Sequence, residues 1–147
     1  MSFKDLIAPA MDIADIHIKA EDGAWLPIDP DGKAFMKPLW TSADSGGWAV
    51  LYRWKSGYEA PPHKHLGAIH VYVVSGKLQV RGAQLCAGDY VYEPNGVIHE
   101  RTLALEDSVH LNIGDGPILF FDDNGITHYF SWEQIEQLQS AAGAENT

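Results

Sequence analysis

Hydrophobic positions in this chain occur in short runs that are rich in aromatic and β-branched residues. Each run is closed by Gly, Pro, Asp or Asn within about ten residues, as expected for short strands joined by tight turns. The runs are KPLWTS, GWAVLYRWKSG, IHVYVVSG, KLQVRG, AGDYVYEP, SVHLNIGDG and PILFFDDNG. This spacing predicts an all-β fold, an antiparallel barrel or sandwich of about six to eight strands.

The two ends of the chain depart from this pattern. The chain is acidic and irregular as far as the DPDG turn at residues 29–32, which predicts an N-terminal arm over residues 1–35. Near the other end, Ser131 and Gln134 form a capping box and Ile135 begins a short apolar face, which predicts a helix over about 131–141. The DDNGI segment (residues 122–126) predicts a hairpin turn with positive φ at Asn124 and Gly125. We expect one domain over residues 1–147, with its barrel core over about 40–125.

Composition and charge narrow the possible partners and the compartment. The formal net charge is −10 and no Lys/Arg cluster offsets it, so nucleic acid and membrane surfaces are not expected partners. No segment approaches the ~20 apolar residues of a membrane span, and the N-terminus lacks a signal-peptide pattern. The single cysteine, Cys86, excludes an intrachain disulfide, and we expect it to be a small buried residue. These features predict a cytoplasmic protein.

Histidines supply the main chemical signal, beginning with the pair in PPHKHLG. His63 and His65 are two residues apart, so in an extended strand both side chains point to one face and can converge on one ion. The pair lies in the spacing G-x5-H-x-H, whose strand closes at Gly76, and a second spacing, G-x5-P-x-G-x2-H, ends at His99. Together these resemble the two motifs of the cupin superfamily over roughly residues 48–125. The resemblance implies a cupin-type antiparallel β-barrel (double-stranded β-helix, or jelly roll) in which His63, His65 and His99 bind one divalent metal.

Two departures from the usual cupin motifs refine this resemblance. Ile69 stands where most cupins have a glutamate ligand, and Leu103 stands where the second motif often ends in Asn. A three-histidine motif is carried by the acetylacetone-cleaving dioxygenases, which the chain also resembles in LQVRGA, GVIHERT and GPILFFDDNG. It is similar as well to the 2,4'-dihydroxyacetophenone dioxygenases and to ChrR-like cupins. The resemblance implies a non-heme Fe(II) dioxygenase that cleaves a C–C bond in a small β-diketone or hydroxyaryl ketone.

The chemistry of three neutral imidazoles agrees with that implication. Without a carboxylate ligand the site keeps the full charge of a divalent metal and leaves up to three octahedral faces open. Such a site favours a bidentate enolate together with O2. Three imidazoles also bind Zn and Ni, which stay possible. We expect an apolar lining that excludes water, formed by Ile69, Val71, Val73 and Leu103.

For some of the other polar residues, strand alternation predicts whether the side chain points into the barrel or away from it. His70 should point away from the metal unless a bulge intervenes, because positions 63, 65, 69 and 71 share a face. No catalytic residue is assigned, and Glu93, His70 and His110 are the candidates for a role behind the metal ligands. Alternation leaves open whether His110 and Asn112 point into the pocket, and whether Glu93 orients a histidine ring or is a solvated turn carboxylate. His17 and His128 lie outside the motifs and are expected to be exposed. The tryptophans are expected in the core or in subunit contacts: Trp25, Trp40, Trp48, Trp54 and Trp132.

Two other functions fit the same ligands. One is a zinc-binding sensor or structural module without turnover, as in cupin domains attached to anti-sigma factors. The other is a metal-dependent isomerase or hydrolase that uses no oxygen. We also expect a homodimer, because HVYVVSGKLQV and ILFF are apolar on both faces. The N-terminal arm or a second subunit must then cover the outer face.

Overall fold

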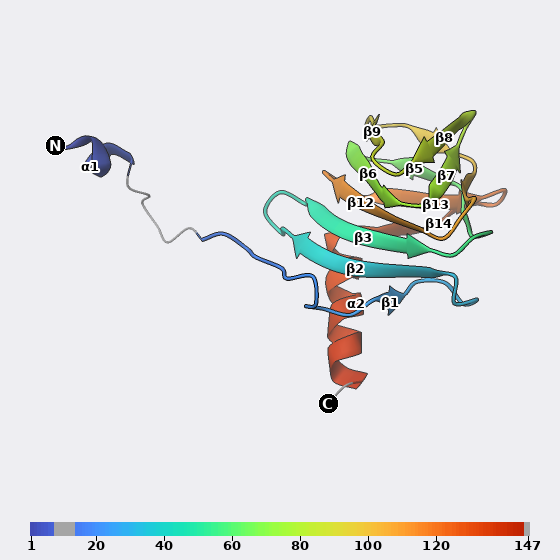
Figure 1. Ribbon diagram of the computed structural model, residues 1–147, viewed down its shortest axis with the longest axis horizontal. Helices are drawn as coiled ribbons and strands as arrows, with labels where there is room; N and C mark the ends of the chain where they lie inside the picture. Colours follow the sequence, from blue (N-terminus) through green and yellow to red (C-terminus); the bar gives the residue numbers. More distant parts are fainter. Residues whose placement is uncertain (8–13, 146–147) are drawn as a thin grey trace.

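The computed structural model describes residues 1–7 and 14–145. In this part of the chain, fourteen short strands and two helices follow one another (Figure 1). Their bounds are α1 (Phe3–Ile7), β1 (Leu26–Pro27), β2 (Ala34–Thr41), β3 (Trp48–Trp54), β4 (Glu59–Ala60), β5 (His63–His65), β6 (Ile69–Ser75), β7 (Lys77–Val80), β8 (Ala83–Cys86), β9 (Tyr90–Glu93), β10 (Ile98–His99), β11 (Thr102–Ala104), β12 (Ser108–Gly114), β13 (Ile118–Asp122), β14 (Gly125–Phe130) and α2 (Trp132–Glu145).

The strands form three antiparallel sheets, which confirms the all-β prediction. One sheet has the order β1-β2-β3-β12-β6-β9, the second β10-β5-β13-β14 and the third β4-β11-β7-β8. The strands outnumber the expected six to eight because bends divide the ribbons, for example at Glu100, which separates β10 from β11. The barrel also extends past the expected range of 40–125, since β2 pairs with β3 along its length and β14 ends at Phe130.

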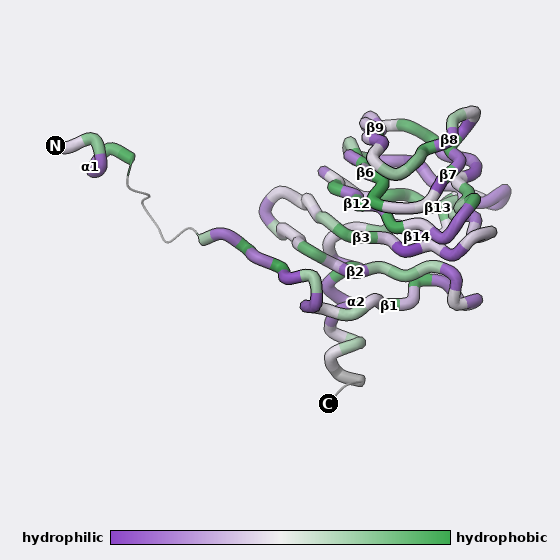
Figure 2. Tube along the Cα trace, in the orientation of Figure 1, coloured by the Kyte–Doolittle hydropathy of each residue, from purple (hydrophilic) through white to green (hydrophobic). Residues whose placement is uncertain are grey.

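The core is built from the inward-facing positions of these strands. Met36, Trp48 and Val50 are buried in one cluster, and α2 adds Ile135 to the same cluster. Trp48 can fill this space because residue 114 is glycine: a Cβ there would lie 2.4 Å from Cζ2 of Trp48. Figure 2 shows that hydrophobic positions concentrate on barrel strands such as β3 and β6.

The predicted C-terminal helix is confirmed, and it ends four residues later than expected, at Glu145. The backbone N–H of Ser131 donates to Oε1 of Gln134 at 2.8 Å, and the hydroxyl of Ser131 contacts the backbone N–H of Glu133 at 3.3 Å. These contacts form the capping box, which begins the helix at Trp132. The helix is 14 residues long. Within the described residues, no helix is both long and apolar enough to cross a membrane.

Two local predictions need correction. Cys86 is exposed rather than buried, because it is the last residue of β8, an edge strand whose outward positions face solvent. The hairpin turn lies where it was predicted, but Gly125 has positive φ and Asn124 does not. The reason is the register: Asp122 pairs with Gly125, so the glycine follows the turn instead of occupying its centre.

The outer face of β12, β6 and β9 carries large exposed hydrophobic side chains. Alternation along these strands places them on one face. They are Tyr72, Val74, Tyr90, Tyr92 and Ile113. Residues 14–24 of the arm are themselves exposed, and α1 has no buried residue and lies away from the barrel in Figure 1. The described part of the arm therefore does not cover this face, and the predicted second subunit stays a prediction.

Candidate metal centre

Three buried histidines meet inside the barrel. His63 and His65 point inward from β5, where the intervening Lys64 is less buried. His99 lies opposite His63 in the antiparallel pairing of β10 with β5. One nitrogen from each ring lies within 4.8 Å of the other two, so the three side chains could hold a metal ion. The structure thus brings together the three residues that the motif spacing singled out.

Hydrogen bonds on the outer side of two rings fix which nitrogen is free. Nδ1 of His63 lies 2.8 Å from the carbonyl oxygen of Pro61. Nε2 of His99 lies 2.7 Å from a carboxylate oxygen of Glu93. Because a neutral imidazole carries one N–H, these contacts place each ring proton on the outer nitrogen. Lone pairs are left on Nε2 of His63 and Nδ1 of His99.

The two free nitrogens face each other at a distance of 3.3 Å. Two lone pairs so close repel each other unless a cation lies between them. Two nitrogens bound to one ion at about 2.1 Å, with angles of about 90–109° at the ion, lie about 3.0–3.4 Å apart. The observed spacing therefore fits two ligands of one metal. His65 stacks on His63 with ring centroids 5.2 Å apart, and its buried Nδ1 has no hydrogen-bond partner among the described residues.

Burial keeps all three rings neutral. It lowers the pKa of His63, although the hydrogen bond to Pro61 opposes this shift. It lowers the pKa of His65 to about 3 and that of His99 to about 4, and nearby histidines add to both shifts. Neutral imidazoles are the form that binds metals, so at neutral pH the triad needs no deprotonation before an ion can bind.

Glu93 contacts the ring of His99 and is largely buried, so it is not a solvated turn carboxylate. It is the last residue of β9, opposite Ile69 on β6, and its side chain is 12% exposed. Burial raises the pKa of Glu93 to about 7, and the positive charge of Arg81 opposes this. The carboxyl group accepts the Nε2–H of His99 and so turns Nδ1 toward the other histidines.

The triad opens into a small cavity of about 100 Å³. Ile69 and Val71 line it as predicted, but Val73 is buried in a second core cluster and Leu103 lies outside. A bend at Glu100 separates β10 from β11, and on β11 Thr102 faces inward in place of Leu103. The wall residues that sequence reasoning missed include Tyr52, Tyr58, Thr102 and Phe120.

A second hollow of about 440 Å³ adjoins this cavity between the barrel and α2. Tyr52, Tyr58 and Phe120 belong to the walls of both. Gln137 and Leu138 of α2 line the outer side, and His128 stacks on Phe120 with centroids 4.6 Å apart. The shared walls place this hollow directly beside the histidine cavity.

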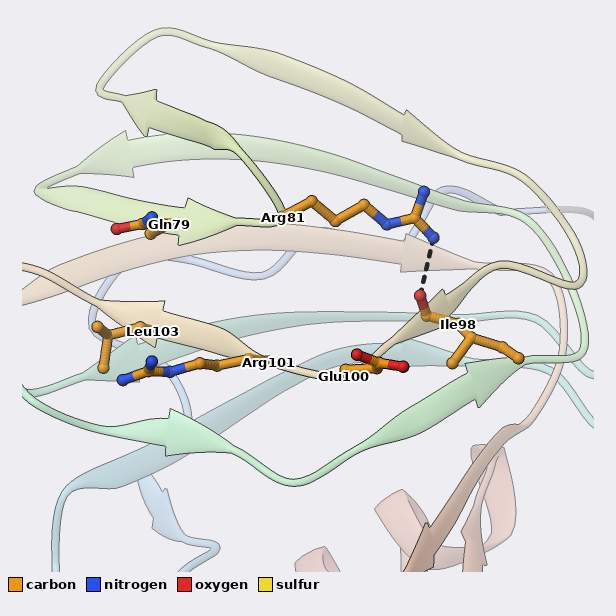
Figure 3. Close-up of a pocket in the computed structure, with 6 residues that line it drawn as sticks. All are labelled: Gln79, Arg81, Ile98, Glu100, Arg101 and Leu103. Carbon is orange, nitrogen blue, oxygen red and sulfur yellow. Dashed lines mark hydrogen bonds between the residues drawn. The ribbon is translucent and has the colours of Figure 1, made fainter.

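A groove of about 530 Å³ on the outer surface contains none of the three histidines (Figure 3). Leu103 lies in this groove, with Glu100 and Arg101 beside it. Arg81 spans it, and its guanidinium donates to the carbonyl oxygen of Ile98 at 2.8 Å. This contact ties the β7–β8 turn to the residue before His99. Arg81 has a φ of 55°, a backbone conformation that non-glycine residues rarely adopt and that hydrophobic patterns do not predict.

The remaining histidines and tryptophans fall on both sides of the barrel wall. His70 points outward, as predicted, and its Nδ1 contacts the hydroxyl of Tyr90. His110 and Asn112, which the sequence left open, both line the cavity. His17 and His128 are exposed, as expected. Trp48 lies in the core, whereas Trp54 is both buried and part of the cavity wall. Trp25 and Trp132 are partly buried and Trp40 is exposed.

Known cupins match this chain in both sequence and fold. The family model described as the ChrR cupin-like domain matches residues 13–119. The acetylacetone-cleaving enzyme of Acinetobacter johnsonii is 26% identical over 121 residues, which span 76% of this chain and 79% of that protein. The crystal structure of an acetylacetone dioxygenase from Acinetobacter johnsonii superposes with a TM-score of 0.82 at 23% identity, covering 91% of this chain and 97% of the other. An RmlC-like cupin protein from Ralstonia eutropha gives a TM-score of 0.80 at 24% identity, covering 92% and 90%.

These likenesses establish the fold and the family. The two solved structures share the cupin barrel with this chain over about nine-tenths of its length. The matched range of the family model covers more than half of the chain and includes all three histidines. The chain therefore belongs to the ChrR cupin-like domain family of the cupin superfamily.

Proposed function

We propose that this protein is a non-heme Fe(II) dioxygenase that cleaves a C–C bond next to a carbonyl in a small β-diketone or hydroxyaryl ketone. The observation that carries the proposal is the pair of free nitrogens on His63 and His99, 3.3 Å apart in a buried triad. The similarity to the acetylacetone-cleaving enzyme of Acinetobacter johnsonii supports the same reaction class.

His63, His65 and His99 are the proposed metal ligands, through one nitrogen each. Iron bound there would supply the Lewis acid that acidifies the ketone, and open positions for substrate and O2. The protein's contribution to the reaction is to hold three neutral imidazole rings around the metal position. Among the described residues, the group that could bind a metal contains no carboxylate, so no negative ligand would offset the charge that attracts an enolate.

Other residues of the cavity position the substrate and exclude water. Ile69 occupies the strand position next to the triad with an apolar side chain, and Glu93 fixes the ring of His99 from behind. A cavity of about 100 Å³ is well below the roughly 300–1,000 Å³ of most ligand pockets, which favours a small head group. Because the protein carries a net charge of −10, the substrate arrives as the neutral ketone and loses its proton at the metal.

We further infer that the chain acts as one cupin domain over residues 1–147 and that two copies associate. The exposed outer face of β12, β6 and β9 supports this assembly. Tyr72 and Tyr92 are large apolar side chains on adjacent strands, and such patches mark association surfaces when they are contiguous.

Two measurements on one sample test the reaction. The protein is loaded with Fe(II) without oxygen, and acetylacetone is added while its absorption is followed; air is then admitted in an oxygen electrode. We expect a new absorption band from enolate binding, followed by uptake of one O2 for each diketone consumed. His63→Ala should show neither effect. Enolate binding without oxygen uptake, across a panel of diketones and hydroxyaryl ketones, would contradict the dioxygenase and favour the zinc-sensor or isomerase reading.

A further inference from the structure

Four buried polar side-chain atoms in the described residues have no hydrogen-bond partner, and all four belong to residues that line the histidine cavity. They are Nε1 of Trp54, Nδ1 of His65, Oγ1 of Thr102 and Nε2 of His110. Buried polar atoms are nearly always paired in folded proteins, so a cluster of exceptions needs an explanation. His65 belongs to the triad; the other three residues do not.

Trp54 and His110 form a continuous piece of the cavity wall. Trp54 ends β3, His110 lies on β12, and the two strands pair so that Tyr52 faces His110 and Ser108 faces Trp54. The rings of Trp54 and His110 meet edge to face, with centroids 4.6 Å apart. Their exposed fractions are 7% and 3%. This wall belongs to the six-stranded sheet, whereas β5 and β10, which carry the triad, belong to another sheet.

Both unpaired atoms of this wall are donors on neutral rings. The side-chain amide nitrogen of Asn112 lies 2.7 Å from Nδ1 of His110, so Nδ1 accepts and the ring proton is on Nε2. Burial lowers the pKa of His110 to about 3, which keeps the ring neutral. The indole nitrogen of Trp54 can only donate. Two N–H groups therefore lie in the wall without acceptors.

An oxygen acceptor of a ligand is the partner that this wall fits. A purely apolar ligand would leave both N–H groups unpaired, and a cation would be repelled by them. We propose that Trp54 and His110 bind a substrate oxygen that is not bound to the metal, so that the substrate is a ketone with a third oxygen atom. This inference rests on the proposed function, because it assumes that the other two oxygens lie at the triad.

A matched pair of ligands tests the proposal without turnover. The protein is loaded with Zn(II), which is redox-inert, and titrated with heptane-2,4-dione or with heptane-2,4,6-trione. The two ligands have the same carbon chain and differ in the third carbonyl. Enolate absorption reports binding, and the ratio of the two affinities is compared between variants, which cancels the intrinsic difference between the ligands.

We expect His110→Phe and Trp54→Phe each to reduce the preference for the trione by about three- to tenfold, the effect of losing one neutral hydrogen bond. His70→Phe is the matched control, because His70 lies on the outer side of β6, and it should leave the preference unchanged. Metal content and melting temperature confirm that each variant is folded. The wild-type protein provides a second measurement that does not depend on the folding of any variant. In ¹⁵N-labelled Zn(II) protein, the Nε2–H signal of His110 should shift with the trione and stay in place with the dione.

The possible results distinguish failure of the subsite proposal from failure of the proposed function. If the wild type and both variants prefer the trione equally, and the His110 signal does not move, the subsite proposal is overturned. Binding of the dione in the same experiment would still support the metal site. In that case the two N–H groups only face neighbouring aromatic rings, a weak structural contact. If Zn(II) is bound but neither ligand binds, the proposed function fails and the subsite fails with it.

Discussion

The hydrogen bond between Glu93 and His99 leads to a quantitative prediction for metal affinity. Its length is 2.7 Å, and the two side chains are 12% and 6% exposed, so solvent screens it little. Hydrogen bonds to charged groups contribute about 1.5–3 kcal/mol, and loss of such a partner behind a metal-bound histidine weakens metal binding about 10- to 100-fold. We therefore expect Glu93→Ala to lower the Zn(II) affinity by about 10- to 100-fold.

The Glu93→Gln variant tests the effect of the carboxylate charge, because the substitution removes that charge and nearly preserves the shape of the side chain. The amide oxygen can still accept the Nε2–H of His99, but the bond is no longer charge-assisted, and neutral bonds are about half as strong. We expect a loss of about three- to tenfold, between the wild type and Glu93→Ala. Zn(II) affinity is measured by competition with a chelator at pH 8, above the pKa of about 7 for Glu93, where the carboxylate is ionised.

Glu59→Gln is the control for this experiment. Glu59 lies 3.1 Å from Arg101 in an ion pair whose side chains are 49% and 65% exposed, and such pairs contribute little. Its removal should leave Zn(II) affinity unchanged. Equal affinities for wild type, Glu93→Gln and Glu93→Ala would refute the reasoning, because the ring of His99 would then be held without Glu93.

Three further predictions concern the triad, the buried wall and the outer face. His63→Ala should abolish metal binding, measured as metal content after loading, whereas His70→Ala should retain it; equal loss in both would mean that strand alternation misplaced His70. His110 has a folded pKa of about 3 against about 6.5 when unfolded, so below pH 6.5 the unfolded state gains a proton that the folded state does not. Urea unfolding of metal-free protein between pH 6 and pH 4.5 should therefore show stability falling by about 1.4 kcal/mol per pH unit more in wild type than in His110→Phe, and parallel slopes would contradict this. Tyr72→Asp should convert a wild-type dimer to a monomer in sedimentation equilibrium, and a wild-type monomer at micromolar concentration would remove the dimer prediction.

The sequence predicted those parts of the site that depend on spacing between residues close in the chain. His63 and His65 share a face of β5 because they are two residues apart. His70 lies on the next strand, β6, and points outward because the alternation counted from β5 holds across residues 66–68. Glycine and proline spacings then brought in His99 through the family resemblance. Each of these inferences needs only local geometry or a fixed motif.

Predictions failed where a bend changed which residues face inward, or where the inward face of a strand was not known. Leu103 was expected in the apolar lining, but the chain bends at Glu100, and Thr102 faces inward instead. The inward position of His110 was undecidable because alternation gives which residues share a face but not which face meets the core. Sequence analysis did not identify Arg81 as a link between the β7–β8 turn and β10, because its hydrogen bond to Ile98 depends on tertiary packing.

Oxygen-isotope labelling tests the central claim most directly. Fe(II)-loaded protein is given acetylacetone under ¹⁸O2 in ordinary water, and the carboxylic acid fragment is analysed by mass spectrometry. A dioxygenase places one atom of ¹⁸O from O2 in that fragment, and His63→Ala should form no fragment at all. An acid fragment that takes its new oxygen only from labelled water would show hydrolytic cleavage and contradict the account.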